Sequence, residues 1–421
     1  MGSEAEKERA ILFGPIYPGA VLKDERALDE LGRLVESAGG EPTGRLVQSI
    51  RTQHPATFFG SGKIQELKEL VCEHEADIAV FDEELTPAQA RNIEKIIGIR
   101  VVDRSELILD IFASRARTTQ AKIQVELAQL QYKLPRLKRM WTHLDRIQAA
   151  IGARGPGETQ IETDRRLIRL KIQQYTQKLK HLTEVNHRTI KNRLDFKVSL
   201  VGYTNAGKST LMRALTGSDV YVADQLFATL DTLTRKLQIK DCGPCLLSDT
   251  VGFVSKLPHH LVSCFHATLS EAMEADLILH VLDSSDPLLA EHFETVQEVL
   301  EQIQCDGIPS IIVANKSDME GSGVGLQILK EFSEEHIAVS AVTGDGLSKL
   351  IELIGQDMTN DWETLDLFIP FEKGDVIAKI KNDVKIIKEN VADNGMYYTI
   401  ETSKEKSYHL GLKKFVMCEN A

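Results

Sequence analysis

Apolar and polar positions alternate along the chain in blocks that predict folded units of different kinds. From about residue 10 to 113 short apolar strands alternate with helical stretches, and residues 197–356 repeat this alternation. Such a rhythm is typical of a parallel α/β sheet with helices on its faces. Residues 362–421 hold only short apolar strands, such as Val384 to Ile387 and Met396 to Ile400, which predict a small α+β unit. The expected strands of the two larger units are residues 10–17, 46–50, 77–81, 99–102, 198–201, 237–239, 246–248, 277–282, 310–314 and 337–339.

Two long helical patterns lie between the α/β units and predict a helical hairpin. Apolar residues at intervals of four and three form one stripe in each pattern, and each stripe is expected to bury the other. The first stripe contains Ile123, Leu127, Leu130, Leu134, Leu137, Trp141 and Leu144, and the second contains Ile168, Ile172, Tyr175, Leu179 and Leu182. Pro135 interrupts the first stripe and is expected to kink that helix. The expected domains are therefore 1–115, 116–193 (the hairpin), 197–356 and 362–421.

The connection between the two helices, residues 151–161, reads IGARGPGETQI. Its three glycines and one proline predict an open loop at the tip of the hairpin. Thr159 or Thr163 is expected to cap the second helix.

Composition indicates an ordinary water-soluble protein. The chain has 421 residues, 42% hydrophobic and 27% charged. No apolar run reaches the roughly 20 residues that a membrane-spanning helix needs. The charged start, MGSEAEKERA, lacks the apolar region of a secretory signal, so we expect a cytoplasmic protein. Six cysteines are too few for a disulfide scaffold.

Charge is segregated along the chain. The net charge is −12, but residues 111–193 hold 18 Lys plus Arg against 6 Asp plus Glu, a local charge of +12. A solvated helix face is the ordinary explanation for a charge run. A same-sign excess over eighty residues of an acidic protein favours contact with a polyanion instead. Arg154, Arg165, Arg166 and Arg169 are the expected polyanion contacts, through phosphates and without base readout.

Four motifs in a fixed order predict a guanine-nucleotide site. Residues 202–209 read GYTNAGKS between an apolar strand and a helical stretch, as a phosphate-binding loop requires. There Lys208 reaches phosphate oxygens and the Ser209 hydroxyl ligates Mg²⁺. DTVG at residues 249–252 supplies a carboxylate for the Mg²⁺ shell and a glycine N–H for the γ-phosphate. Asp318 of NKSD selects guanine, because its carboxylate pairs with two donors that adenine lacks. Ser340, Ala341 and Val342 are expected near guanine O6.

The segment between residues 220 and 234 should contain a threonine that joins Mg²⁺ only when the γ-phosphate is present. We predict Thr229 of FATLD, with Thr232 and Thr234 as alternatives. Phe253 follows DTVG where a glutamine orients water in many GTPases, so intrinsic turnover should be slow. Asn205 leaves two possibilities open: it holds a potassium ion against the phosphates, or it braces the loop by hydrogen bonds.

Two weaker patterns favour plain structural turns. Cys242 and Cys245 form CGPC without a second pair at zinc spacing, and a hairpin turn is the better explanation. Residues 60–63 read GSGK, which is too short for a phosphate loop and fits the start of a helix.

The whole set of motifs resembles the HflX family of translation-factor-class GTPases. The resemblance rests on ARGPGETQIETDRR at residues 153–166, TVGFVSKLPHHLV after the third motif, and FFGSGK upstream. Thr232 departs from the family, which commonly has proline there. The resemblance implies a cytosolic GTPase that binds the large (50S) ribosomal subunit through its hairpin and splits or rescues stalled or idle ribosomes. Two alternatives remain: a GTPase of large-subunit assembly or rRNA remodelling, and a GTP-switched protein scaffold that does not bind RNA.

By position, the resemblance also implies the residues of the site. GTP or GDP with Mg²⁺ is the expected ligand, Ser209 and Thr229 the metal ligands, and Lys208, Thr229 and Gly252 the catalytic residues. No DNA partner, no membrane span and a monomer in solution are expected. The nucleotide contacts would be Gly202, Tyr203, Thr204, Asn205, Ala206, Gly207, Lys208, Ser209, Phe227, Ala228, Thr229, Leu230, Asp231, Asp249, Thr250, Val251, Gly252, Asn315, Lys316, Ser317, Asp318, Ser340, Ala341 and Val342.

Overall fold

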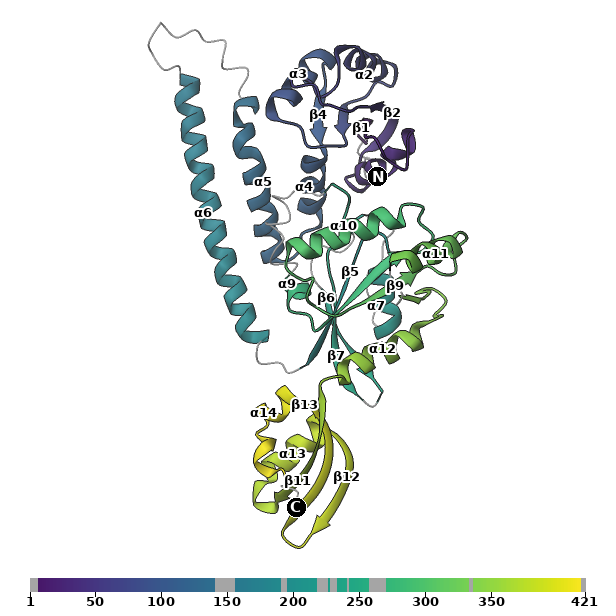
Figure 1. Cartoon of the computed structure of the whole chain (residues 1–421). Helices are drawn as coiled ribbons and strands as arrows, with labels where there is room; N and C mark the ends of the chain where they lie inside the picture. Colours follow the sequence, from purple (N-terminus) through teal and green to yellow (C-terminus); the bar gives the residue numbers. More distant parts are fainter. Residues whose placement is uncertain are drawn as a thin grey trace, which may run out of the picture.

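The first domain is a four-stranded parallel sheet with helices on both faces, seen in a computed structural model of the chain (Figure 1). The structure describes residues 7–140, 156–190, 195–217, 226–227, 233–240, 242–256, 270–332 and 336–417. The strand order is β2-β1-β3-β4. The elements are β1 (Arg9–Ile16), η1 (Glu25–Leu28), α1 (Asp29–Ser37), β2 (Glu41–Ser49), α2 (Ser61–Glu73), β3 (Ile78–Phe81), α3 (Pro87–Ile97), β4 (Arg100–Asp103) and α4 (Arg104–Arg115).

Alternate residues of β1 enter different cores, as the pleat of a strand requires. Ile11 and Phe13 pack with residues of α2 and α3. Leu12 faces the opposite side, toward α1 and α4. The helix α4 begins directly after β4, where the Asp103 carboxylate accepts a hydrogen bond from the Glu106 N–H at 2.9 Å. This first domain therefore has two buried faces, and α4 lies on the one that continues into the rest of the molecule.

A pair of long helices, α5 (Thr119–Met140) and α6 (Pro156–Ile190), lies side by side and forms the expected hairpin (Figure 1). The helix α5 continues through Pro135, and Trp141 and Leu144 of its predicted stripe lie outside the described residues. The prediction of a loop up to residue 161 is wrong, because α6 already begins at Pro156. Proline suits the first turn of a helix, since its fixed φ is helical and its missing N–H would have no partner there. Thr159 and Thr163 consequently lie inside the helix and do not cap it.

The second α/β domain is a six-stranded sheet in the order β10-β9-β8-β5-β7-β6, parallel except for β6. Apolar residues of β5, β7 and β8 are buried under helices on both faces. The predicted strands correspond to these elements. The elements are β5 (Phe196–Gly202), α7 (Lys208–Thr216), β6 (Leu233–Ile239), β7 (Gly243–Asp249), α9 (Ser270–Met273), β8 (Leu277–Asp283), α10 (Leu289–Gln302), β9 (Ser310–Asn315), α11 (Ser322–Phe332), β10 (His336–Ala338) and α12 (Leu347–Thr359).

The C-terminal domain is a three-stranded antiparallel sheet in the order β11-β13-β12, with its own small core. It lies at the end of the molecule opposite the first domain (Figure 1). Within the described ranges, no helix has the length and apolar character that a bilayer crossing requires. The elements are β11 (Trp362–Pro370), η2 (Phe371–Lys373), α13 (Gly374–Asp383), β12 (Lys385–Ala392), β13 (Gly395–Ser403), α14 (Lys404–His409) and η3 (Leu412–Phe415).

Candidate functional site

The predicted phosphate loop connects the end of β5 to the first residue of α7. Asn205 and Gly207 adopt left-handed backbone conformations, with φ of 61° and 91°. A Cβ on Gly207 would lie 2.2 Å from the Asn315 Nδ2 atom, so only glycine fits at that position. The loop ends at Gly207, which caps the N-terminus of the nine-residue helix α7. Free backbone N–H groups at a helix start suit a phosphate anion.

Lys208 and Ser209, the first residues of α7, meet the end of β7. The Ser209 hydroxyl donates to the buried Asp249 carboxylate at 2.6 Å. The Lys208 Nζ donates to the carbonyl oxygens of Gly202 and Tyr203, at 3.0 and 2.8 Å. Burial lowers the pKa of Lys208 to about 8, against the opposing attraction of Asp249. A hydroxyl beside a carboxylate is a donor set that suits Mg²⁺.

Residues that follow Asp249 pair directly with the phosphate loop. The Phe253 N–H donates to the Gly202 carbonyl at 3.1 Å, and the Thr204 N–H donates to the Phe253 carbonyl at 2.7 Å. A Cβ on Gly252 would lie 2.9 Å from the Thr204 Cα atom and 3.0 Å from the Lys208 Nζ atom. The DTVG segment therefore packs closely against the loop. The Phe253 ring is buried in the apolar core and offers no polar atom to a water molecule.

The predicted base-binding motifs lie at the carboxyl ends of β9 and β10. The Asn315 side chain links three segments: its Nδ2 donates to the Ala206 carbonyl at 2.9 Å, and its Oδ1 accepts from the Ala341 N–H at 3.1 Å. Lys316 forms an ion pair with Asp283 at 2.6 Å. Asp318 is exposed beside them. The structure thus brings the phosphate loop, NKSD and the segment after β10 to one edge of the sheet, where ligands of open α/β sheets bind.

Two other groups of predicted residues are described only in part. Phe227 is described and buried, whereas Ala228, Thr229, Leu230 and Asp231 lie outside the described residues, as does Arg154. Arg165, Arg166 and Arg169 lie on α6, and the last two are exposed. Thr234, one of the alternatives to Thr229, donates to Glu271 at 3.3 Å and shares a contact of 3.1 Å with Ser248.

A polar junction between the first domain and the candidate site was not predicted from the sequence. Arg104, only 2% exposed, lies between Glu30 at 2.9 Å and Asp82 at 2.6 Å. Its guanidinium also donates to the Ser255 carbonyl at 3.2 Å and to the Ser255 hydroxyl at 3.1 Å. Lys256 pairs with Asp82 at 2.6 Å. Glu30, Asp82 and Arg104 are far apart in the sequence and match no motif, so no local pattern could have found their contacts with Ser255 and Lys256 of the TVGFVSKLPHHLV run.

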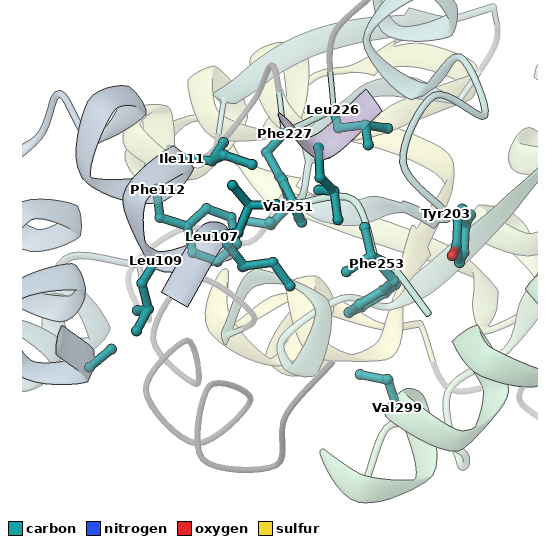
Figure 2. Close-up of a cluster of buried hydrophobic side chains, with 14 of the residues drawn as sticks. Leu107, Leu109, Ile111, Phe112, Tyr203, Leu226, Phe227, Val251, Phe253 and Val299 are labelled. Carbon is teal, nitrogen blue, oxygen red and sulfur yellow. The ribbon is translucent and has the colours of Figure 1, made fainter. Parts of the chain in front are cut away.

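An apolar junction lies beside the polar one. Phe112 of α4 and Phe227 meet edge to face, with ring centroids 4.6 Å apart and planes at 74°. Figure 2 shows both rings and Val251 pointing toward one another, with Leu107 beside them. All four side chains belong to one buried cluster that also contains Phe253. Residues of the nucleotide-site segments and residues of α4 therefore share a single hydrophobic core.

The two weaker sequence patterns lie at the start of a strand and the start of a helix. Cys242 and Cys245 flank the start of β7, and the described residues contain no group of three or more metal-ligating side chains. Burial raises the pKa of the Cys245 thiol to about 12, which keeps it unreactive. Gly60 precedes the first residue of α2, as expected for a helix start.

Comparison with known proteins covers most of the chain. Three family models match in sequence order: "GTP-binding GTPase N-terminal" at residues 25–113, "GTP-binding GTPase Middle Region" at 115–193, and "50S ribosome-binding GTPase" at 197–316. GTPase HflX of Caldanaerobacter subterraneus is 42% identical over 95% of this chain and 92% of its own length. GTPase HflX of Escherichia coli is 43% identical over 89% of this chain and 88% of its own.

One solved structure illustrates a more distant likeness. A GTP-binding protein from Sulfolobus solfataricus in complex with GDP is 25% identical, over 84% of this chain and 99% of its own, with a TM-score of 0.44. The family assignment rests on the two HflX relatives and not on this solved structure. With its family models and its close relatives over nearly the whole length, the chain belongs to the HflX family and is a GTP-binding and GTP-hydrolysing protein.

Proposed function

We propose that this GTPase binds the large ribosomal subunit through its basic hairpin, in a manner gated by GTP, and that it splits or rescues stalled or idle ribosomes. One observation carries the gating: the residues that follow DTVG share a core and an ion network with α4 of the first domain. The helix α5 buries Ala121, Val125, Ala128 and Tyr132 in that same core. A change in the nucleotide site therefore acts on the base of the hairpin.

Magnesium and the γ-phosphate are the proposed inputs to this gate. Ser209, next to Asp249, would hold Mg²⁺ together with Thr229, and the metal would neutralise charge on the phosphates. The backbone N–H of Gly252 would meet the γ-phosphate beside Lys208. The Thr229 and Gly252 contacts depend on the terminal phosphate, so hydrolysis releases them.

Slow intrinsic turnover fits a protein that waits for its partner. The Phe253 ring is 3% exposed and packs in the junction core, so it cannot orient the attacking water. Asn205 is exposed, and no side-chain hydrogen bond involves it among the described residues. Holding the loop by hydrogen bonds would require a partner for the Asn205 side chain. These facts therefore favour the other role, in which Asn205 holds a potassium ion against the phosphates. We propose that the ribosome supplies the remaining stimulation.

Contact of the hairpin with ribosomal RNA is proposed from its charge. Arg166 and Arg169 are exposed near the start of α6, at the end of the hairpin connected to its tip. Salt-sensitive binding to phosphates follows from such a surface, because each neutralised phosphate releases counterions.

Co-sedimentation of the full-length protein with purified large subunits tests this proposal. Binding is measured with GDP and with a non-hydrolysable GTP analogue at several salt concentrations. We expect tighter binding with the analogue, and we expect Arg165→Glu with Arg166→Glu to weaken it at least about tenfold while GDP affinity stays unchanged. Light scattering of whole ribosomes then reports whether subunits separate.

The matched control is Lys178→Glu with Lys180→Glu, which makes the same charge change at exposed positions farther along α6. It should retain most of the binding. Equal binding by the arginine variant and the unmodified protein at every salt concentration would exclude the hairpin as the contact. Binding only to immature particles would favour the assembly role, and binding that ignores the nucleotide would exclude the gate.

A further inference from the structure

The phosphate loop carries a tyrosine whose side chain leaves the nucleotide site and enters the domain junction. The Tyr203 ring stacks on His292 of α10, with centroids 3.7 Å apart and planes at 17°. Its hydroxyl donates to Glu30 of α1 at 2.7 Å and accepts from the Ser255 N–H at 2.5 Å. Tyr203 is 5% exposed. One side chain therefore joins the phosphate loop to α10, to the segment after DTVG and to the first domain.

Glu30 is fixed on its own side of the junction. Its carboxylate accepts from the Ser255 hydroxyl at 2.5 Å and pairs with Arg104 at 2.9 Å. Burial works to raise the pKa of Glu30, but the Arg104 charge and the hydrogen bonds from Ser255 and Tyr203 outweigh it and lower the pKa. An ionised carboxylate only accepts hydrogen bonds, so the Tyr203 hydroxyl is the donor in the contact with Glu30. The contact is charge-assisted and part-buried, which makes it stronger than an ordinary surface hydrogen bond.

The backbone of Tyr203 faces the nucleotide side. Its carbonyl accepts a hydrogen bond from the Lys208 Nζ at 2.8 Å. Its neighbour Thr204 packs closely against Gly252. Phosphate oxygens compete with this carbonyl for the Lys208 ammonium, and the β-phosphate is present in GDP and in GTP. The carbonyl and the hydroxyl of Tyr203 belong to one residue whose ring stacks on His292, so a shift of the loop at the carbonyl would move the hydroxyl as well.

We propose that Tyr203 and Glu30 form a link by which the first domain senses occupancy of the phosphate loop by either GDP or GTP. This signal differs from the γ-phosphate signal, because it starts from the loop and its lysine rather than from DTVG. The first domain thus receives two inputs, one for a bound diphosphate and one for the terminal phosphate. The inference does not depend on ribosome binding.

Hydrogen–deuterium exchange of the full-length protein, with and without GDP, tests the link. The readout is the exchange of peptides that cover α1, residues 29–37. We expect GDP to change this exchange by about threefold or more in the unmodified protein. Tyr203→Phe removes only the hydroxyl and keeps the stacked ring, so it should abolish the α1 response when each protein is saturated with GDP, at a concentration set from its own measured affinity. Glu30→Gln should do the same from the other side of the contact.

The control is Tyr132→Phe, which removes another buried hydroxyl, on α5, that contacts Glu106 rather than the phosphate loop. It should keep the response. An α1 response that survives in Tyr203→Phe would overturn the link, and so would an α1 helix that responds to a GTP analogue but not to GDP. Neither result bears on the hairpin experiment, so the two proposals fail separately.

Discussion

At the scale of single residues, Lys208 couples nucleotide binding to a proton. Burial lowers its pKa to about 8, whereas phosphate oxygens around Nζ favour the charged amine. At pH 8.5 about three quarters of such amines are neutral, so GDP binding should take up about 0.8 proton, and affinity should fall as pH rises above 8. Titration calorimetry in two buffers of different ionisation enthalpy measures this uptake.

The same titration at pH 7.0 is the internal reference, because about nine tenths of the amines already carry the proton there. Uptake should then be close to zero. Equal proton counts at the two pH values would mean that Lys208 is fully charged before the nucleotide arrives. The lysine itself could be found in the sequence, because its motif is local, but its lowered pKa could not, because it follows from burial.

At the scale of elements, α4 holds the segment that precedes Thr229. Phe112→Ala removes the ring against which Phe227 packs, and losing a buried phenyl costs about 3–5 kcal/mol of packing. We expect hydrogen exchange in a peptide that covers residues 226–227 to accelerate about tenfold, with little change in the phosphate loop. Val71→Ala, in the other core of the first domain, is the control and should leave that peptide unchanged. If Val71→Ala accelerates exchange in that peptide as much as Phe112→Ala does, the effect comes from a general loosening of the first domain.

The same helix shows where sequence reasoning stops. Strands such as β3 and β8 could be predicted, because each is a short apolar run bounded by polar turns. The strands β2 and β6 begin at Glu41 and Leu233, before the expected 46–50 and 237–239, because their first halves are mostly polar. The helix α4 was not predicted as a separate element, because it is buried on several sides, from Arg104 to Phe112, and shows no one-sided stripe. Glu30, Asp82 and Arg104 meet only in the folded chain. The sequence pattern places the start of α6 too late, because GPGETQ is typical of a loop unless Pro156 is taken as a first helical residue.

At the scale of the whole molecule, the domains are joined unequally. The first domain shares its core with the nucleotide-site segments, whereas the buried core of the C-terminal domain is built from its own residues, such as Leu367, Ile380 and Ile400. Figure 1 places that domain beyond α12, at the opposite end of the molecule from the first domain. The two ends of the chain should therefore tolerate deletion very differently.

A chain ending at residue 361 tests this asymmetry. The buried core beneath the phosphate loop uses residues no later than Ile354, and Met358 packs at its edge, so the shortened protein keeps the whole core. We expect its GDP affinity and intrinsic GTP hydrolysis to stay within about twofold of the full-length values. A chain that begins at residue 195 should instead lose the partners of Ser255, Lys256 and Phe227, and its hydrolysis rate and its exchange at residues 226–227 should both change. Fluorescent-nucleotide titration and single-turnover hydrolysis compare the two chains. A tenfold loss of GDP affinity in the first chain would show that the C-terminal domain supports the nucleotide site through contacts outside the shared cores.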